Sequence, residues 1–102
     1  MDSLIQTLSK MADELNQLID KTSDPDEQDQ LSDQLDQVYS QKGKLINKAI
    51  DQATGEYQSA TKALKEASQS IEKAIQKLGK TAEVIEKIAK AISQVSKVIQ
   101  KV

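Results

Sequence analysis

Apolar residues recur along the second half of the chain in steps that alternate strictly between four and three residues. The series lasts for eight heptads without a slip, and sixteen of its seventeen members are apolar. The members are Ile46, Ile50, Ala53, Tyr57, Ala60, Leu64, Ala67, Ile71, Ala74, Leu78, Thr81, Ile85, Ile88, Ile92, Val95, Ile99 and Val102. A repeat of about 3.5 residues lies along one side of a helix and needs a partner helix to exclude water. This series, called the heptad seam below, predicts an all-α protein with coiled-coil heptads.

The N-terminal part of the chain predicts a separate helix near residues 3–21. Its apolar positions follow helical spacing and are Leu4, Leu8, Met11, Leu15 and Leu18. A strong helix-start signal follows, because Asp24 suits the N-cap of a new helix and Pro25 suits its first position. We therefore expect a tight turn at Asp24 and Pro25, which returns the second helix antiparallel to the first.

The second helix is predicted to be long, from residue 25 to residue 78. Its first apolar positions are Leu31, Leu35, Val38 and Leu45, with Lys42 on the same line. After Gly43 the apolar line shifts by one residue, which predicts a bend or a change of packing partner there. Gly55 falls on the outer face, so the helix is expected to continue through it. A break at Thr54-Gly55 is the alternative, and it would give four helices instead of three.

A second turn is predicted between residues 78 and 81. Gly79 suits the left-handed position that follows a helix, and Thr81 suits the cap of a last helix over residues 81–102. Because the heptad phase continues through this turn, a single rod from Pro25 to Val102 is the competing structure. The expected fold is one domain, residues 1–102: an elongated antiparallel helical hairpin or three-helix bundle, with the outer helices folded back on the middle one.

The composition limits how the chain can be stabilised. There is no Phe and no Trp, and only two Tyr, so the core has to be aliphatic. A helical hairpin of 102 residues leaves much of its apolar stripe uncovered, and part of the stabilisation is expected from association.

The charge is also unevenly distributed. Residues 1–43 carry ten acidic residues and three lysines, whereas residues 44–102 carry six acidic residues and eleven lysines. We expect these acidic and basic arms to attract each other.

Several classes of function are disfavoured by what the chain lacks. Without Cys and His, thiolate and imidazole metal sites are absent, and without Arg or an aromatic stacking platform no nucleic-acid binding is expected. The densest group of carboxylates does not match the spacing of a calcium loop. That group is Asp24, Asp26, Asp29, Asp33 and Asp36. No nucleophile is placed with a base and an orienting group, so we expect no catalytic residue, no metal and no cofactor.

The predicted function is therefore non-enzymatic assembly through helices, with a second copy or a helical protein as partner. The residues expected to carry it belong to the seam and are Ile71, Leu78, Ile85, Ile88, Ile92, Val95 and Ile99. The alternative is a membrane-active or pore-forming component, because residues 82–102 form a cationic amphipathic segment of the kind that lies on anionic bilayers. No cleavable signal peptide and no long apolar run is recognised, which predicts a soluble protein, either cytoplasmic or secreted without a cleaved signal.

Two resemblances to known families bear on assembly. The segment Thr22-Ser23-Asp24-Pro25 between two amphipathic helices resembles the turn of type III secretion needle subunits, which are small helical hairpins that polymerise. This resemblance covers four residues and implies self-assembly, without assigning a role to any residue. The long Gln- and Lys-rich helices are also similar in style to α-helical pore-forming toxins.

Overall fold

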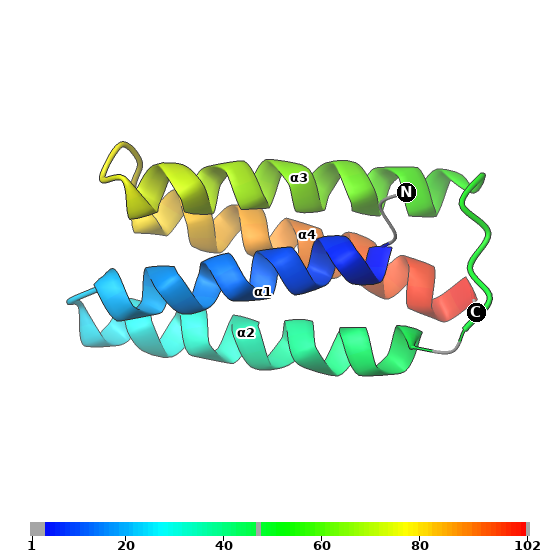
Figure 1. Cartoon of the computed structure of the whole chain (residues 1–102), viewed down its shortest axis with the longest axis horizontal. Helices are drawn as coiled ribbons and strands as arrows, with labels where there is room; N and C mark the ends of the chain where they lie inside the picture. The colour runs from blue at the N-terminus through cyan, green and yellow to red at the C-terminus, as the bar shows by residue number, and fades with distance from the viewer. Residues whose placement is uncertain (1–3, 47, 102) are drawn as a thin grey trace.

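The computed structural model describes residues 4–46 and 48–101, which form four α-helices (Figure 1). Helix α1 spans Leu4–Lys21, α2 spans Pro25–Leu45, α3 spans Gly55–Ile75 and α4 spans Thr81–Lys101. The helices pack side by side into a bundle that measures 39 × 21 × 20 Å. The predicted limits at residues 3 and 102 lie outside the described residues.

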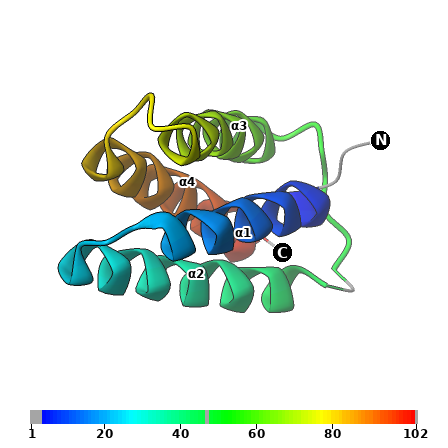
Figure 2. The same ribbon diagram turned by 60° about the vertical axis from the view of Figure 1, so that its left-hand side comes forward.

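The order of the helices around the bundle differs from their order in the sequence. Helix α1 contacts α2 and α3, and α4 contacts α3 and α2, whereas the described residues of α2 and α3 make no contact with each other. Helices α1 and α3 run in one direction, and α2 and α4 run in the other (Figures 1 and 2). The connection from α2 to α3, residues 46–54, therefore crosses the bundle diagonally at the end where α1 begins and α4 ends. Asn47 within this connection lies outside the described residues.

The prediction of an elongated three-helix structure is wrong, because the expected middle helix over residues 25–78 is interrupted. It ends at Leu45, begins again at Gly55 and ends at Ile75. Local hydrogen bonds explain the break. The Thr54 hydroxyl accepts a hydrogen bond from the Tyr57 N–H (3.2 Å) and caps α3. The alternative break at Thr54-Gly55 is the one found, and the rod from Pro25 to Val102 is excluded.

The start of α2 follows the prediction. Asp24 is the N-cap, and its carboxylate accepts hydrogen bonds from the N–H groups of Asp26 (2.9 Å) and Glu27 (3.3 Å). Pro25 occupies the first helical position, where a missing N–H has no consequence. The turn that these two residues form brings α2 back antiparallel to α1.

The end of α3 differs from the prediction for Gly79. The left-handed residue is Lys77, with a φ of 64°, and no glycine has a positive φ. The Lys77 N–H bonds to the Ala74 carbonyl (3.0 Å) and the Leu78 N–H to the Lys73 carbonyl (2.8 Å), which together form a Schellman motif. The chain thus leaves α3 two residues before Gly79, and Gly79 needs no special conformation.

The start of α4 also differs in detail, because Thr81 is the first residue of the helix rather than the cap before it. The carbonyl of Lys80 accepts the first helical hydrogen bond, from the Val84 N–H (3.3 Å). The turn itself lies where the sequence predicts it.

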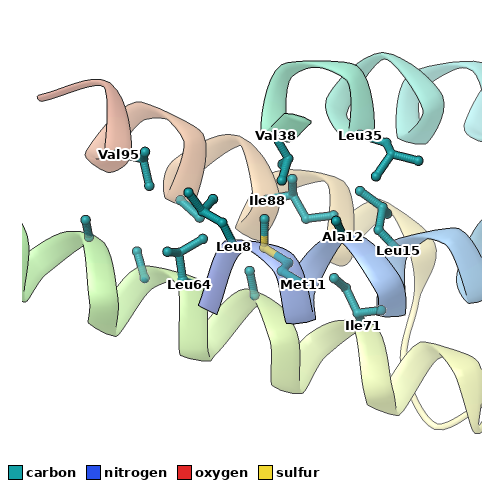
Figure 3. Close-up of a cluster of buried hydrophobic side chains, with 14 of the residues drawn as sticks. Leu8, Met11, Ala12, Leu15, Leu35, Val38, Leu64, Ile71, Ile88 and Val95 are labelled. Atoms are coloured by element: carbon teal, nitrogen blue, oxygen red, sulfur yellow. The ribbon is translucent and has the colours of Figure 1, made fainter. Parts of the chain in front are cut away.

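The core is aliphatic except for Tyr57 and receives side chains from all four helices (Figure 3). One cluster of fully buried side chains contains Leu8 and Leu15 of α1, Val38 of α2, Leu64 of α3 and Ile88 of α4. One chain therefore supplies all four walls of this core.

Candidate functional site

The seven seam residues predicted to carry assembly do not lie on one surface. Ile71, Ile88 and Val95 are fully buried in the core. The side chain of Leu78, in the turn between α3 and α4, is 73% exposed. The other three are half-buried along one edge of α4, and they are Ile85, Ile92 and Ile99.

The split arises because the buried face of α4 is rotated relative to the heptad seam. Its fully buried side chains are Val84, Ile88, Ala91, Val95 and Val98. This row shares only Ile88 and Val95 with the seam, so the remaining seam residues of α4 lie beside it. Helix α4 packs against both α3 and α2, and two neighbours need a wider apolar face than one seam provides.

Contact between α2 and α4 depends on two glutamines. Gln34 donates from Nε2 to the backbone carbonyl of Ile85 (2.8 Å), and Gln41 donates to the carbonyl of Ile92 (2.9 Å) and to Ser96 Oγ (3.0 Å). The glutamines are seven residues apart on α2, and their carbonyl acceptors are seven residues apart on α4. This repeat fixes the parallel register of the two helices.

The same glutamines introduce a defect into the packing. Their side chains are only 7% and 6% exposed, yet Oε1 of Gln34 and Oε1 of Gln41 have no hydrogen-bond partner in the described structure. A buried acceptor without a partner destabilises the contact that buries it. Helix α2 is therefore held less firmly by α4 than an apolar helix would be.

Charge adds a second polar feature to the pair formed by α2 and α4. Helix α2 contains five acidic residues and two lysines, whereas α4 contains two glutamates and four lysines. The acidic arm thus lies beside the basic arm within one molecule. The two ion pairs found in the described structure join other helices, namely Lys10 to Glu72 (4.0 Å) and Lys101 to Glu56 (3.7 Å).

The connection between α2 and α3 holds three members of the heptad seam outside any helix. The side chain of Ile46 is 45% exposed, Ala53 is exposed and Ile50 is partly buried. They keep the phase of Tyr57 in α3, although residues 48–54 are not helical. The bundle therefore leaves part of the apolar pattern unused.

A carboxyl group is buried between α1 and α3. Glu14 accepts a hydrogen bond from Ser68 Oγ, and Glu72 lies next to it. Burial and the neighbouring Glu72 raise the pKa of Glu14 from 4.5 to about 7, although the hydrogen bond from Ser68 and the charge of Lys10 act in the opposite direction. The cluster borders an open polar groove of about 410 Å³ between the two helices. This arrangement can hold or release one proton near neutral pH.

Two features that would indicate a metal site or a membrane span are absent from the described residues. Within residues 4–46 and 48–101, no group of three or more Asp, Glu, His or Cys side chains is arranged to bind a metal ion. None of the helices there combines the length and the apolar character that crossing a bilayer requires.

Neither the two buried glutamines nor the buried carboxyl group was predicted from the sequence. A signal is present for the glutamines, because Gln34 and Gln41 stand three residues after the buried Leu31 and Val38 and repeat every seven residues. For Glu14 no such signal exists. Its place on the flank of an apolar stripe is also typical of an exposed residue, and burial depends on Ser68 of a distant helix.

Comparison with protein-family models, with curated proteins and with solved structures finds no match to this chain.

Proposed function

We propose that this protein is a non-enzymatic assembly module that associates through its helices with a second copy or with a helical partner. The supporting observation is that the heptad seam is longer than the part of it that the bundle covers. Ile46 and Leu78 keep the heptad phase, yet their side chains are 45% and 73% exposed. Apolar side chains in a regular register are typical of helix partners.

The residues that we assign to contact with a partner differ from the seam residues predicted from the sequence. Ile71, Ile88 and Val95 are covered within the chain and stabilise the fold. The remaining seam residues, above all Leu78 and Ile46, are accessible without unfolding. Contact with a partner is therefore assigned to the uncovered members of the seam.

Sedimentation velocity at rising micromolar concentrations tests the proposal. We expect the mass to exceed that of one chain, and we expect Ile46→Ser and Leu78→Ser to weaken association. Tyr39→Ser is the matched control, because this side chain is 47% exposed but lies outside the seam. The mass of a single chain at every concentration would contradict self-association, and equal effects of all three substitutions would contradict the role of the seam.

Membrane binding through α4 receives less support. Four lysines lie on this helix, but Val84, Ile88 and Ala91, which would have to meet the lipid, are buried in the core. Co-sedimentation with anionic vesicles distinguishes the two functions. Binding of a single chain to vesicles, without association in their absence, would favour the membrane alternative.

A further inference from the structure

The connection between α2 and α3 contains two conflicting signals. Its apolar residues, Ile46, Ile50 and Ala53, have the spacing of a helix that continues α3 backwards. Its polar residues break that helix, because Asp51 Oδ1 accepts a hydrogen bond from the Ala53 N–H (2.9 Å) and Thr54 caps α3. The break thus depends on a few local hydrogen bonds, and those made by Asp51 are exposed.

If this connection became helical, one helix would extend from Pro25 to Ile75. It would contain 51 residues and measure about 77 Å at a rise of about 1.5 Å per residue. The longest dimension of the bundle is 39 Å. The α1–α2 hairpin would then be too far from the α3–α4 hairpin of its own chain to pack on it.

The contacts of α2 make such an opening feasible. In the described structure α2 does not touch α3, so straightening the connection breaks no contact between these two helices. The contacts that open are those of α1 with α3, those of α2 with α4, and the packing of Ile50 against the core. The second set includes Gln34 and Gln41, whose Oε1 atoms are buried without a partner.

We propose that two copies of this chain associate by exchanging their α1–α2 hairpins, with residues 48–54 as the hinge. The inference rests on the proposed assembly function and names a second copy as the partner. Each hairpin packs on the α3–α4 hairpin of the other copy, and the hydrogen bonds from Gln34 to Ile85 and from Gln41 to Ile92 form again between copies. Exchange of an identical element is an accessible route to a dimer, because the native contacts are reused.

The exchanged dimer also accounts for three unused members of the seam, whereas Leu78 remains in the turn between α3 and α4. In the straightened helix, Ile46, Ile50 and Ala53 join Tyr57 on one face. The two long helices cross at their hinges, where these faces can pack on each other. Association then buries side chains that the single bundle leaves exposed.

A distance within one chain tests the exchange directly. The chain contains no Cys, so Gln30→Cys and Lys73→Cys, both at exposed positions near the turn end of the bundle, accept two spin labels without competition. In the bundle the labels are separated by a distance close to its 21 Å width. In the straightened helix 43 residues separate them, which corresponds to about 65 Å. Dilution with unlabelled protein restricts the measurement to one chain.

Two pairs of substitutions move the hinge in opposite directions. Asp51→Ala with Thr54→Ala removes the turn and the cap, and should strengthen dimerisation about tenfold and increase the long-distance population. Ala49→Gly with Gln52→Gly disfavours the helix at two exposed positions outside the apolar face and should decrease both quantities. If the first pair does not fold, the second pair and the unmodified chain still give the answer.

The outcomes separate this inference from the proposed function. A long distance in the dimer, responding to both pairs in the stated directions, supports the exchange. A dimer that shows only the short distance overturns the exchange and leaves the assembly function intact. A single chain at all concentrations and in all variants overturns both.

Discussion

Lys77 adopts a left-handed backbone conformation with a φ of 64°. In this conformation a Cβ atom clashes with the backbone, whereas glycine has no Cβ and is not penalised. Lys77→Gly should therefore raise the free energy of unfolding by about 1 kcal/mol. Gly79→Ala should not destabilise the protein, because the added Cβ would lie 3.5 Å from the Lys73 Cβ, which is an ordinary contact. Chemical denaturation of both variants checks this assignment. If Gly79→Ala destabilises the protein and Lys77→Gly does not stabilise it, the left-handed residue is Gly79 and not Lys77.

Glu14 makes the stability depend on pH. Its pKa is about 7 in the folded state and 4.5 as the ordinary value, so between these values the folded state retains a proton that the unfolded state releases. The contribution of Glu14 to stability is thus complete below pH 4.5 and is lost as the pH rises through about 7.

Glu14→Gln should abolish this decline, because the amide does not ionise, and should raise the melting temperature above pH 7 relative to the parent. Glu72→Gln is the matched variant. It removes the neighbour that raises the pKa of Glu14, so the decline should persist but end at a lower pH. Melting temperatures across this pH range provide the measurement, and an unchanged slope in Glu14→Gln would contradict the assignment.

At the scale of the helices, we expect two buried acceptors without a partner to weaken the contact between α2 and α4. Gln34→Met with Gln41→Met keeps side chains of similar length and removes two buried acceptors that have no partner. The Ile85 and Ile92 carbonyls lie inside a helix, so they do not depend on the glutamines. We expect a gain of about 1 kcal/mol in the free energy of unfolding, measured by denaturant titration. Gln37→Met, at an exposed position of α2, is the control and should change little.

The same double substitution should leave the dimerisation constant unchanged, because the contact between α2 and α4 is present in both the single bundle and the exchanged dimer. It should, however, slow the interconversion of the two forms, since the contact has to open. A change in the constant without a change in rate would argue against exchange.

The positions of most apolar core residues could be predicted from sequence, whereas the connections between helices could not. Leu8, Leu15 and Val38 are buried as their spacing indicates, and the cap at Asp24 is present. Periodicity reports which side of a segment is apolar, but not whether the backbone continues. The break before Thr54 is decided by short-range hydrogen bonds, which a continuous heptad phase conceals.

The order of the helices around the bundle could not be predicted from the apolar pattern either. Each stripe needs neighbours, but the stripes do not specify which ones. The diagonal connection between α2 and α3 is compatible with the same heptads as a connection between adjacent helices. For the same reason the pattern assigned one role to buried Ile88 and exposed Leu78.

Because Ile88 is buried and Leu78 is exposed, we expect Ile88→Asp to affect the folding of the whole molecule rather than association. A carboxylate at this fully buried position should lower the free energy of unfolding by about 4 kcal/mol and abolish most of the helical circular dichroism. Leu78→Asp, at an exposed position in the turn between α3 and α4, should preserve the helical signal. It weakens association only where the partner contacts this turn, which exchange of the α1–α2 hairpin does not require. A helical single chain in the Ile88 variant would instead place this residue at the interface between copies.

Salt dependence tests whether the segregated charges stabilise the whole molecule. The acidic α2 packs beside the basic α4, so their attraction favours the folded bundle, and increasing salt from about 0.05 M to about 0.5 M should lower the melting temperature. The ion pairs of Lys10 and Lys101 are exposed and contribute little. Asp33→Asn with Asp36→Asn should therefore reduce the salt dependence more than Glu72→Gln does.

Exchange keeps the acidic helix beside a basic one, so salt should affect the single bundle and the dimer alike. A melting temperature that rises with salt would show that apolar packing dominates and would contradict the attraction between the arms.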